Sequence, residues 1–412
     1  MTPLAPTDHL ALPFFEAAHR ELASTLAAWV PQQQVDERDD RRACREWVRL
    51  LGDAGWLRYC VPAQFGGALN QLDSRALVIL RETLAFHSPL ADFAFAMQGL
   101  GSGAITLAGT PAQQAAYLPA VARGDKIAAF ALSEADAGSD AGAMKTVASY
   151  SINTGASGLN GLNNPENTPA AATVMLNGSK TWISNGGIAD YYCVFAKTEP
   201  LLGTRGITAF IVDASTPGLD ASESIEVMAP HPLATLRFDD CRIAASAQLG
   251  ELNGGFKLAM RTLDIFRASV AGAALGMARR ALAEALAYAR ARPMFGQRLS
   301  DFQLTQARLG EMAALIDAAA LLTYRAAWLR DALGTATPAQ AQAYTMAAAM
   351  AKMTATENAQ RVIDMALQLH GGLGVKVGTK VESLYRDIRS LRIYEGATEV
   401  QLLIIGKSVL RT

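Results

Sequence analysis

The sequence predicts an α+β protein of three consecutive parts, in which a small β domain lies between two helical regions. The hydrophobic spacing is helical up to about Asp125 and again after Leu249, whereas short apolar runs separated by Gly, Asn, Asp and Pro fill the stretch between them. The length of 412 residues corresponds to about two to four domains, enough to enclose a cofactor. We therefore expect domains at residues 1–126, 127–244 and 245–412.

The first two parts differ in the spacing of their apolar residues. The N-terminal part predicts amphipathic helices, with spacings of three and four residues among Phe14, Phe15, Ala18, Leu22, Leu26 and Trp29. In the middle part, Tyr191 to Ala196 and Ile207 to Val212 predict strands. The segment from Ser149 to Ala172 is rich in Gly, Asn, Ser, Thr and Pro, and it predicts an exposed insertion loop.

The C-terminal part contains three long stretches rich in Ala, Leu, Met and Arg. These stretches predict helices at Gly255 to Arg290, Asp301 to Leu333 and Pro338 to Leu369. Three or four long antiparallel helices of this kind form a bundle.

Composition and charge exclude several classes of protein. The 37 Lys and Arg residues nearly balance the 38 Asp and Glu residues, which gives a formal net charge of -1. Nucleic-acid binders usually carry a positive excess, so we expect no nucleic-acid partner. The apolar runs are much shorter than the roughly 20 residues that a membrane span needs, and we expect no membrane helix. The N-terminus carries Asp8 and lacks a basic region before a long apolar stretch, so we expect a cytoplasmic protein.

Cysteine and histidine are too scattered to indicate a disulfide framework or a metal site. The cysteines are Cys44, Cys60, Cys193 and Cys241, and none forms a CxxC pair. The five histidines lack the HxxxH and HExxH spacings of metal ligands. We expect buried, reduced thiols and no metal, so redox or acid–base chemistry would need a carboxylate and an organic cofactor.

Two segments of the middle part are suited to binding a ligand. The segment FALSEADAGSD, Phe130 to Asp140, begins as an apolar strand and ends in a Gly-Ser turn that could hold an anion or a carbonyl, although a plain strand end is the alternative. In LNGSKTWISNG, Asn177-Gly178 predicts a hairpin turn before Lys180. Trp182 could form one wall of a flat cofactor site, or it could fill the core of a half-buried strand.

Two segments of the C-terminal part raise similar alternatives. In RPMFGQRLSDFQ, Arg292 lies at a helix end, where it could contact phosphate or face solvent. Glu395 follows the apolar Leu391 and Ile393, so it could be a carboxylate whose pKa is raised by an apolar pocket, or a solvated glutamate at a helix start. No GxGxxG follows a strand, which excludes a Rossmann fingerprint.

Taken together, these segments resemble the acyl-CoA dehydrogenase family from about Leu10 to Leu410. The resemblance lies in the order and spacing of FALSEADAGSD, LNGSKTWISNG, LDIFR, RPMFGQRLSDFQ, QLHGG and RIYEGATEVQ. It implies an N-terminal α-helical domain, a central β-barrel-like domain and a C-terminal four-helix bundle that enclose FAD. It also implies a homotetramer built as a dimer of dimers.

The resemblance implies a set of FAD-binding residues. Those along the flavin and ribityl chain would be Phe130, Leu132, Ser133, Gly138 and Ser139, with Trp182 and Ser184 over the ring. Those that reach the FAD of a neighbouring subunit would be Arg292, Phe295, Gln303, Gln368, Gly371 and Gly372. Thr398 and Glu399 would also lie along the cofactor, although many members of the family have Thr where this chain has Ala397.

The resemblance further implies α,β-dehydrogenation of an acyl-CoA, with Glu395 as the general base and an electron-transferring flavoprotein as the acceptor. A minority branch carries its base immediately before the arginine that corresponds to Arg267, but this chain has Phe266 there. The residues near the thioester and CoA would be Ser139, Asp264, Arg267 and Gly396, and those near the acyl chain Phe93, Ala96, Met97, Leu100 and Val270. The bulk of Phe93 and Met97 predicts a short, branched or cyclic acyl group.

Two alternatives keep the same fold. The first is an oxidase-like or flavin monooxygenase-like enzyme that uses oxygen as its acceptor; the presence of Glu395 and the chain's end at Thr412 favour the dehydrogenase. The second is a DNA-associated binding protein, which would need a basic surface that the net charge of -1 does not provide.

Overall fold

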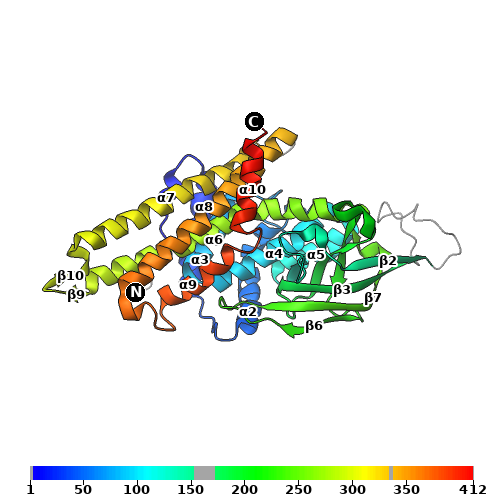
Figure 1. Cartoon of the computed structure of the whole chain (residues 1–412), viewed down its shortest axis with the longest axis horizontal. Helices are drawn as coiled ribbons and strands as arrows, with labels where there is room; N and C mark the ends of the chain where they lie inside the picture. Colours follow the sequence, from blue (N-terminus) through cyan, green and yellow to red (C-terminus); the bar gives the residue numbers. More distant parts are fainter. Residues whose placement is uncertain (1–2, 153–171, 334–336, 412) are drawn as a thin grey trace. The chain divides into compact units, whose positions relative to one another are not determined.

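The computed structural model describes residues 3–152, 172–333 and 337–411 (Figure 1). The chain divides into two compact units. We call Met1–Gln34, Asp73–Asp92 and Asp264–Thr412 the bundle unit, and Val35–Leu72 and Phe93–Leu263 the β unit. Two long helices, α4 (Pro89–Ala108) and α6 (Gly255–Ala291), contribute residues to both units.

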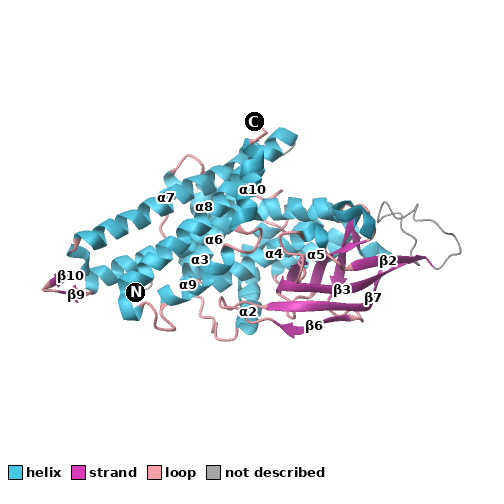
Figure 2. Ribbon diagram, viewed as in Figure 1, coloured by secondary structure: helices cyan, strands magenta, loops and turns pink. Residues whose placement is uncertain are grey.

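The β unit contains one large sheet and the helices α2 (Asp40–Asp53) and α5 (Pro111–Arg123), as Figure 2 shows by colour. The strands run in the order β6-β7-β3-β2-β4-β5-β8, and β1 pairs in parallel with β4. Buried and accessible residues alternate over most of β3, whereas β4 and β5 are buried along almost their whole length. The strands are β1 (Ala128–Ala131), β2 (Val147–Ile152), β3 (Ala172–Ser184), β4 (Tyr191–Lys197), β5 (Ile207–Asp213), β6 (Leu219–Ser224), β7 (Leu233–Ala244) and β8 (Gln248–Leu249).

The hairpin predicted at Asn177-Gly178 is wrong, because β3 runs straight through both residues. The pairing of β3 with β7 shifts register between Leu176 and Gly178, so the dipeptide forms a bulge instead of a turn. Gly178 has φ 135°, and a Cβ there would stand 2.8 Å from the Cα of Thr146, which explains the glycine. The predicted insertion loop also begins and ends as strand, in β2 and at Ala172, and its residues 153–171 lie outside the described part of the chain.

The bundle unit is helical apart from one short hairpin. The helices α7 and α8 pack along each other, α9 and α10 pack on α8, and α3 packs on α1 and α7. The three long helices begin and end within two residues of their predicted bounds. The elements are α1 (Ala17–Trp29), α3 (Ser74–His87), α7 (Gln303–Leu333), α8 (Pro338–His370), α9 (Lys380–Leu391), α10 (Thr398–Val409), β9 (Pro293–Met294) and β10 (Gln297–Arg298).

The fold class predicted from the sequence is confirmed: an N-terminal helical region and a C-terminal helical region flank a central β sheet. The four cysteines are free and buried, as expected. Among the described residues, no cluster of His, Cys, Asp and Glu could hold a metal ion.

One described stretch, Gln303–Ala332 of α7, is long and apolar enough to span a membrane by length and composition alone. The expectation of no membrane helix rested on the shortness of the uninterrupted apolar runs, whereas charged residues such as Arg308, Glu311 and Asp317 interrupt this longer stretch. A core helix of a bundle has the same length and composition. In the bundle unit, α7 packs against α3 and α8.

Close approach of α6 to α3 gives a test of packing in the bundle unit. A Cβ on Gly276 would stand 2.1 Å from the carbonyl oxygen of Glu82, so we expect Gly276→Ala to force the helices apart and lower the free energy of unfolding by about 2 kcal/mol or more. Gly310 of α7 is exposed with open space around it, and Gly310→Ala should stabilise by up to about 1 kcal/mol. Urea unfolding followed by circular dichroism measures both variants. Equal unfolding midpoints for Gly276→Ala and the wild type would contradict the prediction.

Candidate active site

Glu395 lies in a turn between α9 and α10 whose backbone is strained. Glu395 has φ 52° and Gly396 has φ 92°, so both residues are in the left-handed region. For a residue other than glycine this conformation costs about 1–3 kcal/mol and persists only where the surroundings hold it. Gln401 Nε2 donates to the carbonyl oxygens of Glu395 at 3.3 Å and Gly396 at 2.9 Å, and Lys352 Nζ donates to the same Gly396 oxygen at 2.8 Å.

The carboxylate of Glu395 is buried on one side and unpartnered. Its Oε2 atom is inaccessible to solvent and has no hydrogen-bond partner among the described residues. Burial raises the pKa of Glu395, an effect that the charges of Arg81, Lys352 and Arg267 oppose and that of Asp92 reinforces. The solvated glutamate at a helix start is therefore excluded, and the carboxylate has the environment expected of a general base.

Arg81 of α3 and Asp92 of α4 form a buried ion pair in the surroundings of Glu395. Arg81 Nε and Nη2 donate to the two oxygens of Asp92 at 2.8 and 3.0 Å, and Nη1 donates to Ser269 Oγ at 3.1 Å. Burial raises the pKa of Asp92 while Arg81 opposes the rise. The bidentate geometry compensates the guanidinium charge, so Arg81 acts on Glu395 as one half of a dipole.

Arg267 and Asp264, one helical turn apart on α6, form a second ion pair. Tyr344 donates its hydroxyl to the carbonyl oxygen of Asp264 at 2.6 Å, and Thr345 Oγ1 donates to Asp264 Oδ2 at 3.2 Å. The Nε atom of Arg267 is buried, and none of the described residues accepts from it. Arg267 and Glu395 thus each present a buried polar atom that the described protein leaves unsatisfied, which is typical of a ligand site.

In the β unit, the turn that follows β1 is held by a buried lysine. The side chain of Lys180 is inaccessible, and its Nζ donates to the carbonyl oxygen of Leu132 at 3.0 Å and to Glu134 Oε1 at 2.8 Å. Glu134 also accepts from the main-chain N–H of Lys145 at 2.6 Å and of Thr146 at 3.0 Å. These contacts fix the strand end.

The rest of the turn is open. Among the described residues, no atom lies within 4 Å of the position that a Cβ on Gly138 would take. Ser139 is exposed. Ser133 is partly accessible, and its carbonyl oxygen accepts from the N–H of Thr181 at 3.0 Å. Leu132 is buried, and the ring of Phe130 packs on Phe195 at 4.9 Å between centroids.

Trp182 does not fill the core. It lies in a bulge between Lys180 and Ile183, has φ 60° and is 56% exposed, whereas Ser184 at the end of β3 is half-buried. A large aromatic residue in the left-handed region is uncommon, and bulges often redirect a side chain next to an active site. The exposed indole is suited to cover a flat ring.

A further group of predicted cofactor residues lies at one end of the bundle unit. The β9–β10 hairpin is labelled in Figure 1. Within this hairpin Phe295 has φ 48° and is 89% exposed. Tyr288 of α6 stacks on His370 of α8 at 4.4 Å between centroids, which brings the ends of these two helices together. The exposed members of the group are Arg292, Phe295, Gln303, Gln368, Gly371 and Gly372.

Thr398 and Glu399 differ in their surroundings. Thr398 Oγ1 donates to Glu357 Oε1 at 2.6 Å, an oxygen that also accepts from Arg392 Nε at 2.9 Å. The hydroxyl proton of Thr398 is therefore already used within the protein, while Glu399 is exposed. A cofactor contact for either residue stays a prediction.

The predicted acyl-chain residues of α4 share one helix face. Phe93, Met97 and Leu100 follow each other at spacings of four and three residues, and all three are buried. The ring of Phe93 lies 4.6 Å from that of His231 between centroids. In the bundle unit, Val270 of α6 is also buried.

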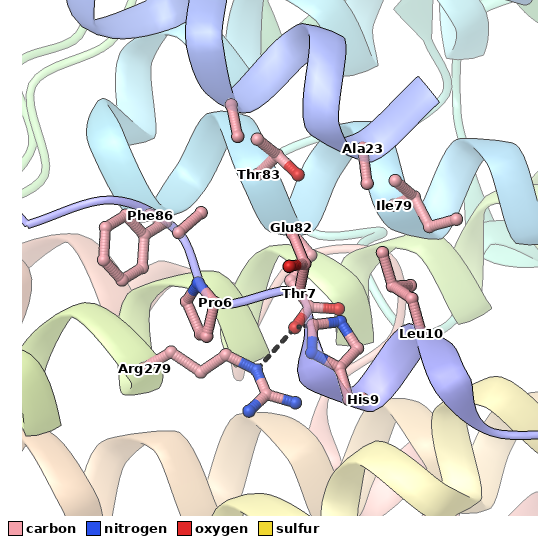
Figure 3. Close-up of a pocket in the computed structure, with 12 residues that line it drawn as sticks. Pro6, Thr7, His9, Leu10, Ala23, Ile79, Glu82, Thr83, Phe86 and Arg279 are labelled. Carbon is pink, nitrogen blue, oxygen red and sulfur yellow. Dashed lines mark hydrogen bonds and ion pairs between the residues drawn. The ribbon is translucent and has the colours of Figure 1, made fainter. Parts of the chain in front are cut away.

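Another buried polar cluster lies under the N-terminal segment of the bundle unit (Figure 3). Glu82 accepts from Arg279 Nε at 2.6 Å and from the hydroxyl of Tyr324 at 2.9 Å, and the ring of His9 stacks on that of Tyr324. The adjoining cavity has a volume of about 10 Å³, room for about one water molecule. The cavity is too small for a substrate, so we assign this cluster a structural role.

Comparison with known proteins identifies the fold. Family models for acyl-CoA dehydrogenase match residues 16–125 with the N-terminal domain, 129–241 with the middle domain and 253–410 with the C-terminal domain. The chain belongs to the acyl-CoA dehydrogenase family. It is therefore an oxidoreductase that acts on CH–CH groups, in a family that depends on FAD.

The chain is similar over most of its length to several enzymes of this family. A 3-(aryl)acrylate reductase of Clostridium sporogenes is 35% identical over 97% of this chain and 100% of the relative. The caffeyl-CoA reductase–Etf complex subunit CarC of Acetobacterium woodii is 36% identical over 89% of this chain and 90% of the relative. The mitochondrial short-chain specific acyl-CoA dehydrogenase of Homo sapiens is 37% identical over 89% and 82%.

A solved acyl-CoA dehydrogenase of Bacillus anthracis in complex with FAD has a TM-score of 0.84 and 30% identity, over 96% of this chain and 67% of that one. The side chains present here fit such a cofactor. The β unit offers the exposed indole of Trp182 and the open turn at Gly138, and the bundle unit offers Arg292 in an exposed position.

Sequence reasoning missed the charged residues that support the site. Arg81, Asp92, Lys180 and Lys352 are all buried, although none was selected as a candidate. The available signal was a charged residue inside a largely apolar run, as in LVILRETL and PLADFAF, because a charged residue on a buried face needs a partner.

The Glu134–Lys180 pair gives a second prediction. Glu134→Ala leaves the buried amine of Lys180 without its carboxylate, so we expect the free energy of unfolding to fall by about 3 kcal/mol or more near neutral pH. Burial holds the pKa of Lys180 at about 8, below its ordinary value of 10.5. Glu134 raises this pKa, so its removal lowers the pKa of Lys180 further, and the defect should shrink as the pH rises toward about 8 and stay constant above it.

Urea unfolding across this pH range measures the effect. Asp136→Ala is the control, because Asp136 pairs with Lys145 on the exposed side of the same turn. It should change the stability little. A Glu134→Ala protein as stable as the control would contradict the prediction.

Proposed function

We propose that this protein dehydrogenates a short acyl-CoA thioester at its α and β carbons to trans-2-enoyl-CoA, with Glu395 as the general base. The observation that carries the proposal is the Glu395 carboxylate, which is held in a left-handed turn with a buried, unpartnered Oε2. The Oε2 atom in this state has lone pairs free for a proton, and no donor among the described residues weakens it.

The reaction needs a base and a site for developing negative charge. The α proton of a thioester is weakly acidic, and the raised pKa of Glu395 strengthens the carboxylate that removes it. We assign the main-chain N–H of Glu395 as a donor to the thioester oxygen, where charge develops as the proton leaves. FAD, when bound, supplies the acceptor for the β hydrogen and its two bonding electrons, so that the carbon–carbon double bond forms.

Arg267 is our candidate for contact with the CoA portion, because its unsatisfied Nε offers a donor beside the base. Asp264 keeps this guanidinium in place through the ion pair on α6. Gly396 and Ser139 complete the proposed substrate contacts, Gly396 through the main chain of the turn and Ser139 through its exposed hydroxyl.

We propose a short, branched or cyclic acyl group. Phe93, Met97 and Leu100 place bulky side chains on one face of α4, which would shorten an acyl tunnel along it. The relative from Homo sapiens is named for short-chain substrates, and two bacterial relatives are named for aryl-substituted acrylates.

A second candidate is the reverse reaction, reduction of a 2-enoyl thioester. The names of the relatives from Clostridium sporogenes and Acetobacterium woodii support it, because both are reductases. Glu395 would then return a proton to the α carbon. The name of the second relative also supports an electron-transferring flavoprotein as the redox partner. An oxygen-using enzyme remains the alternative for the acceptor.

We further propose a cytoplasmic homotetramer, built as a dimer of dimers, in which FAD is shared between subunits. In the bundle unit, Arg292, Phe295 and Gln303 project from the hairpin end, where Phe295 leaves an aromatic ring 89% exposed. Exposed apolar side chains of this size are typical of contact surfaces. A cofactor bound across such a contact would couple FAD affinity to assembly.

A test of the base is Glu395→Gln. This variant keeps the shape of the side chain but cannot accept the α proton, so we expect it to retain bound FAD and to lose dehydrogenation by about a hundredfold or more. The flavin spectrum of the purified protein measures FAD content, and anaerobic dye reduction measures turnover. Turnover close to that of the wild type would remove Glu395 from this role.

A test of the substrate is anaerobic titration of the FAD-loaded protein with a panel of thioesters. We expect bleaching of the flavin by butyryl-CoA, branched acyl-CoA or phenylpropionyl-CoA, and little bleaching by palmitoyl-CoA. Oxidation of a chemically reduced flavin by enoyl-CoA would favour the reductase direction. Rapid peroxide formation after air is admitted would favour an oxidase. The best response with palmitoyl-CoA would contradict the short-acyl proposal.

A further inference from the structure

We propose that Lys352 is a positioning residue for the general base: together with Gln401 it holds the Gly396 carbonyl and so fixes the turn that presents Glu395. This inference rests on the proposed role of Glu395. Lys352 is a buried cation of α8 that takes no direct part in the proposed reaction, and the inference gives it a function.

The geometry places two donors on one carbonyl oxygen. Lys352 Nζ of α8 and Gln401 Nε2 of α10 donate to Gly396 O at 2.8 and 2.9 Å, and both side chains are fully buried. Because water is excluded, neither donor has a competing partner from solvent. Two helices thus hold a turn that would otherwise relax out of the left-handed region.

The turn at Gly396 is in close contact with the side chain of Gln401. A Cβ on Gly396 would stand 2.4 Å from Gln401 Nε2, so the amide and the glycine backbone are in direct contact. Gln401 also reaches the carbonyl oxygen of Glu395 at 3.3 Å. Loss of either donor should allow the carboxylate to shift relative to a bound substrate, and small misplacements of a catalytic group cost much of the rate.

The charge of Lys352 is compensated differently from the charges of Arg81 and Arg267, the other two cations that act on Glu395. Arg81 has Asp92 and Arg267 has Asp264 as ion-pair partners, whereas Lys352 has no carboxylate within ion-pair distance in the described part of the chain. Burial lowers the pKa of Lys352 to about 8, and Glu395 is the strongest of the charges that oppose this. A protonated Lys352 therefore favours the ionised form of the base.

Other charged groups act on Glu395 and Lys352. Glu395 is influenced by Arg81 of α3, Arg267 of α6 and Asp92 of α4. Lys352 is influenced by Arg267, and by Glu357 and Glu399, which are on α8 and α10. Removing Lys352 deletes none of these groups, so a change in the pKa of Glu395 reflects the lost charge of Lys352 together with any shift of the turn.

The test is Lys352→Met, which keeps the length of the side chain but removes the donor and the charge. We expect kcat to fall by about tenfold to a hundredfold with unchanged FAD content. We also expect the acid limb of the kcat–pH profile to move up by about one pH unit, because a lost cation raises the pKa of Glu395. Gln401→Leu removes a neutral donor, so it should lower kcat without moving the acid limb.

The two variants should be non-additive when combined, because they share the Gly396 carbonyl. Ile363→Val is the control, a fully buried change three turns further along α8 that should lower the unfolding midpoint and leave the pH profile as in the wild type. If Lys352→Met does not accumulate as folded protein, Gln401→Leu carries the test, and unchanged kcat in that variant overturns the proposal.

Two further outcomes overturn the inference while leaving Glu395 as the base. One is wild-type kcat and pH profile in Lys352→Met. The other is a lower kcat with an unmoved acid limb and lost FAD, which would give Lys352 a merely structural role. Activity in Glu395→Gln would instead contradict the proposed function itself, so the two failures are distinguishable.

Discussion

The left-handed turn at Glu395 and Gly396 is the constraint on which the rest of the bundle unit depends. A glutamate with φ 52° is unfavourable unless its neighbours hold it, and here two fully buried side chains from α8 and α10 do so. The strain sets the direction of the carboxylate, whose Oε2 is left without a described partner. Packing of the helices therefore leaves this carboxylate free for its proposed role as a base.

The charges around Glu395 balance two opposing requirements. A base must be strong enough to remove a weakly acidic proton, which burial favours, and it must still be ionised before the reaction, which nearby cations favour. Arg81 and Arg267 are each offset by an aspartate, so their influence on the carboxylate is reduced. The net result is a raised pKa for Glu395 in spite of three cations.

Local sequence patterns predicted the fold well and the supporting residues poorly. The three long helices are Ala-rich and strongly periodic, so their bounds follow from the pattern. Asn177-Gly178 carried a hairpin signal, but pairing of β3 with β7 turned the same two residues into a bulge. The contact between Arg81 and Asp92 joins two helices whose approach no local pattern encodes. The exposure of Trp182 likewise follows from a register shift in the sheet.

Both units contain a buried lysine that donates to a main-chain oxygen. Lys180 in the β unit and Lys352 in the bundle unit are buried amines that donate to a main-chain oxygen of a turn proposed to face a ligand, and burial lowers the pKa of each to about 8. They differ in their counter-ions. The charge of Lys180 is balanced by the Glu134 carboxylate, with which it forms an ion pair. For Lys352 no carboxylate lies within ion-pair distance in the described part of the chain, and among the charges that favour its protonated form that of Glu395 is stronger than those of Glu357 and Glu399. This ties the position of the turn to the protonation state of the proposed base.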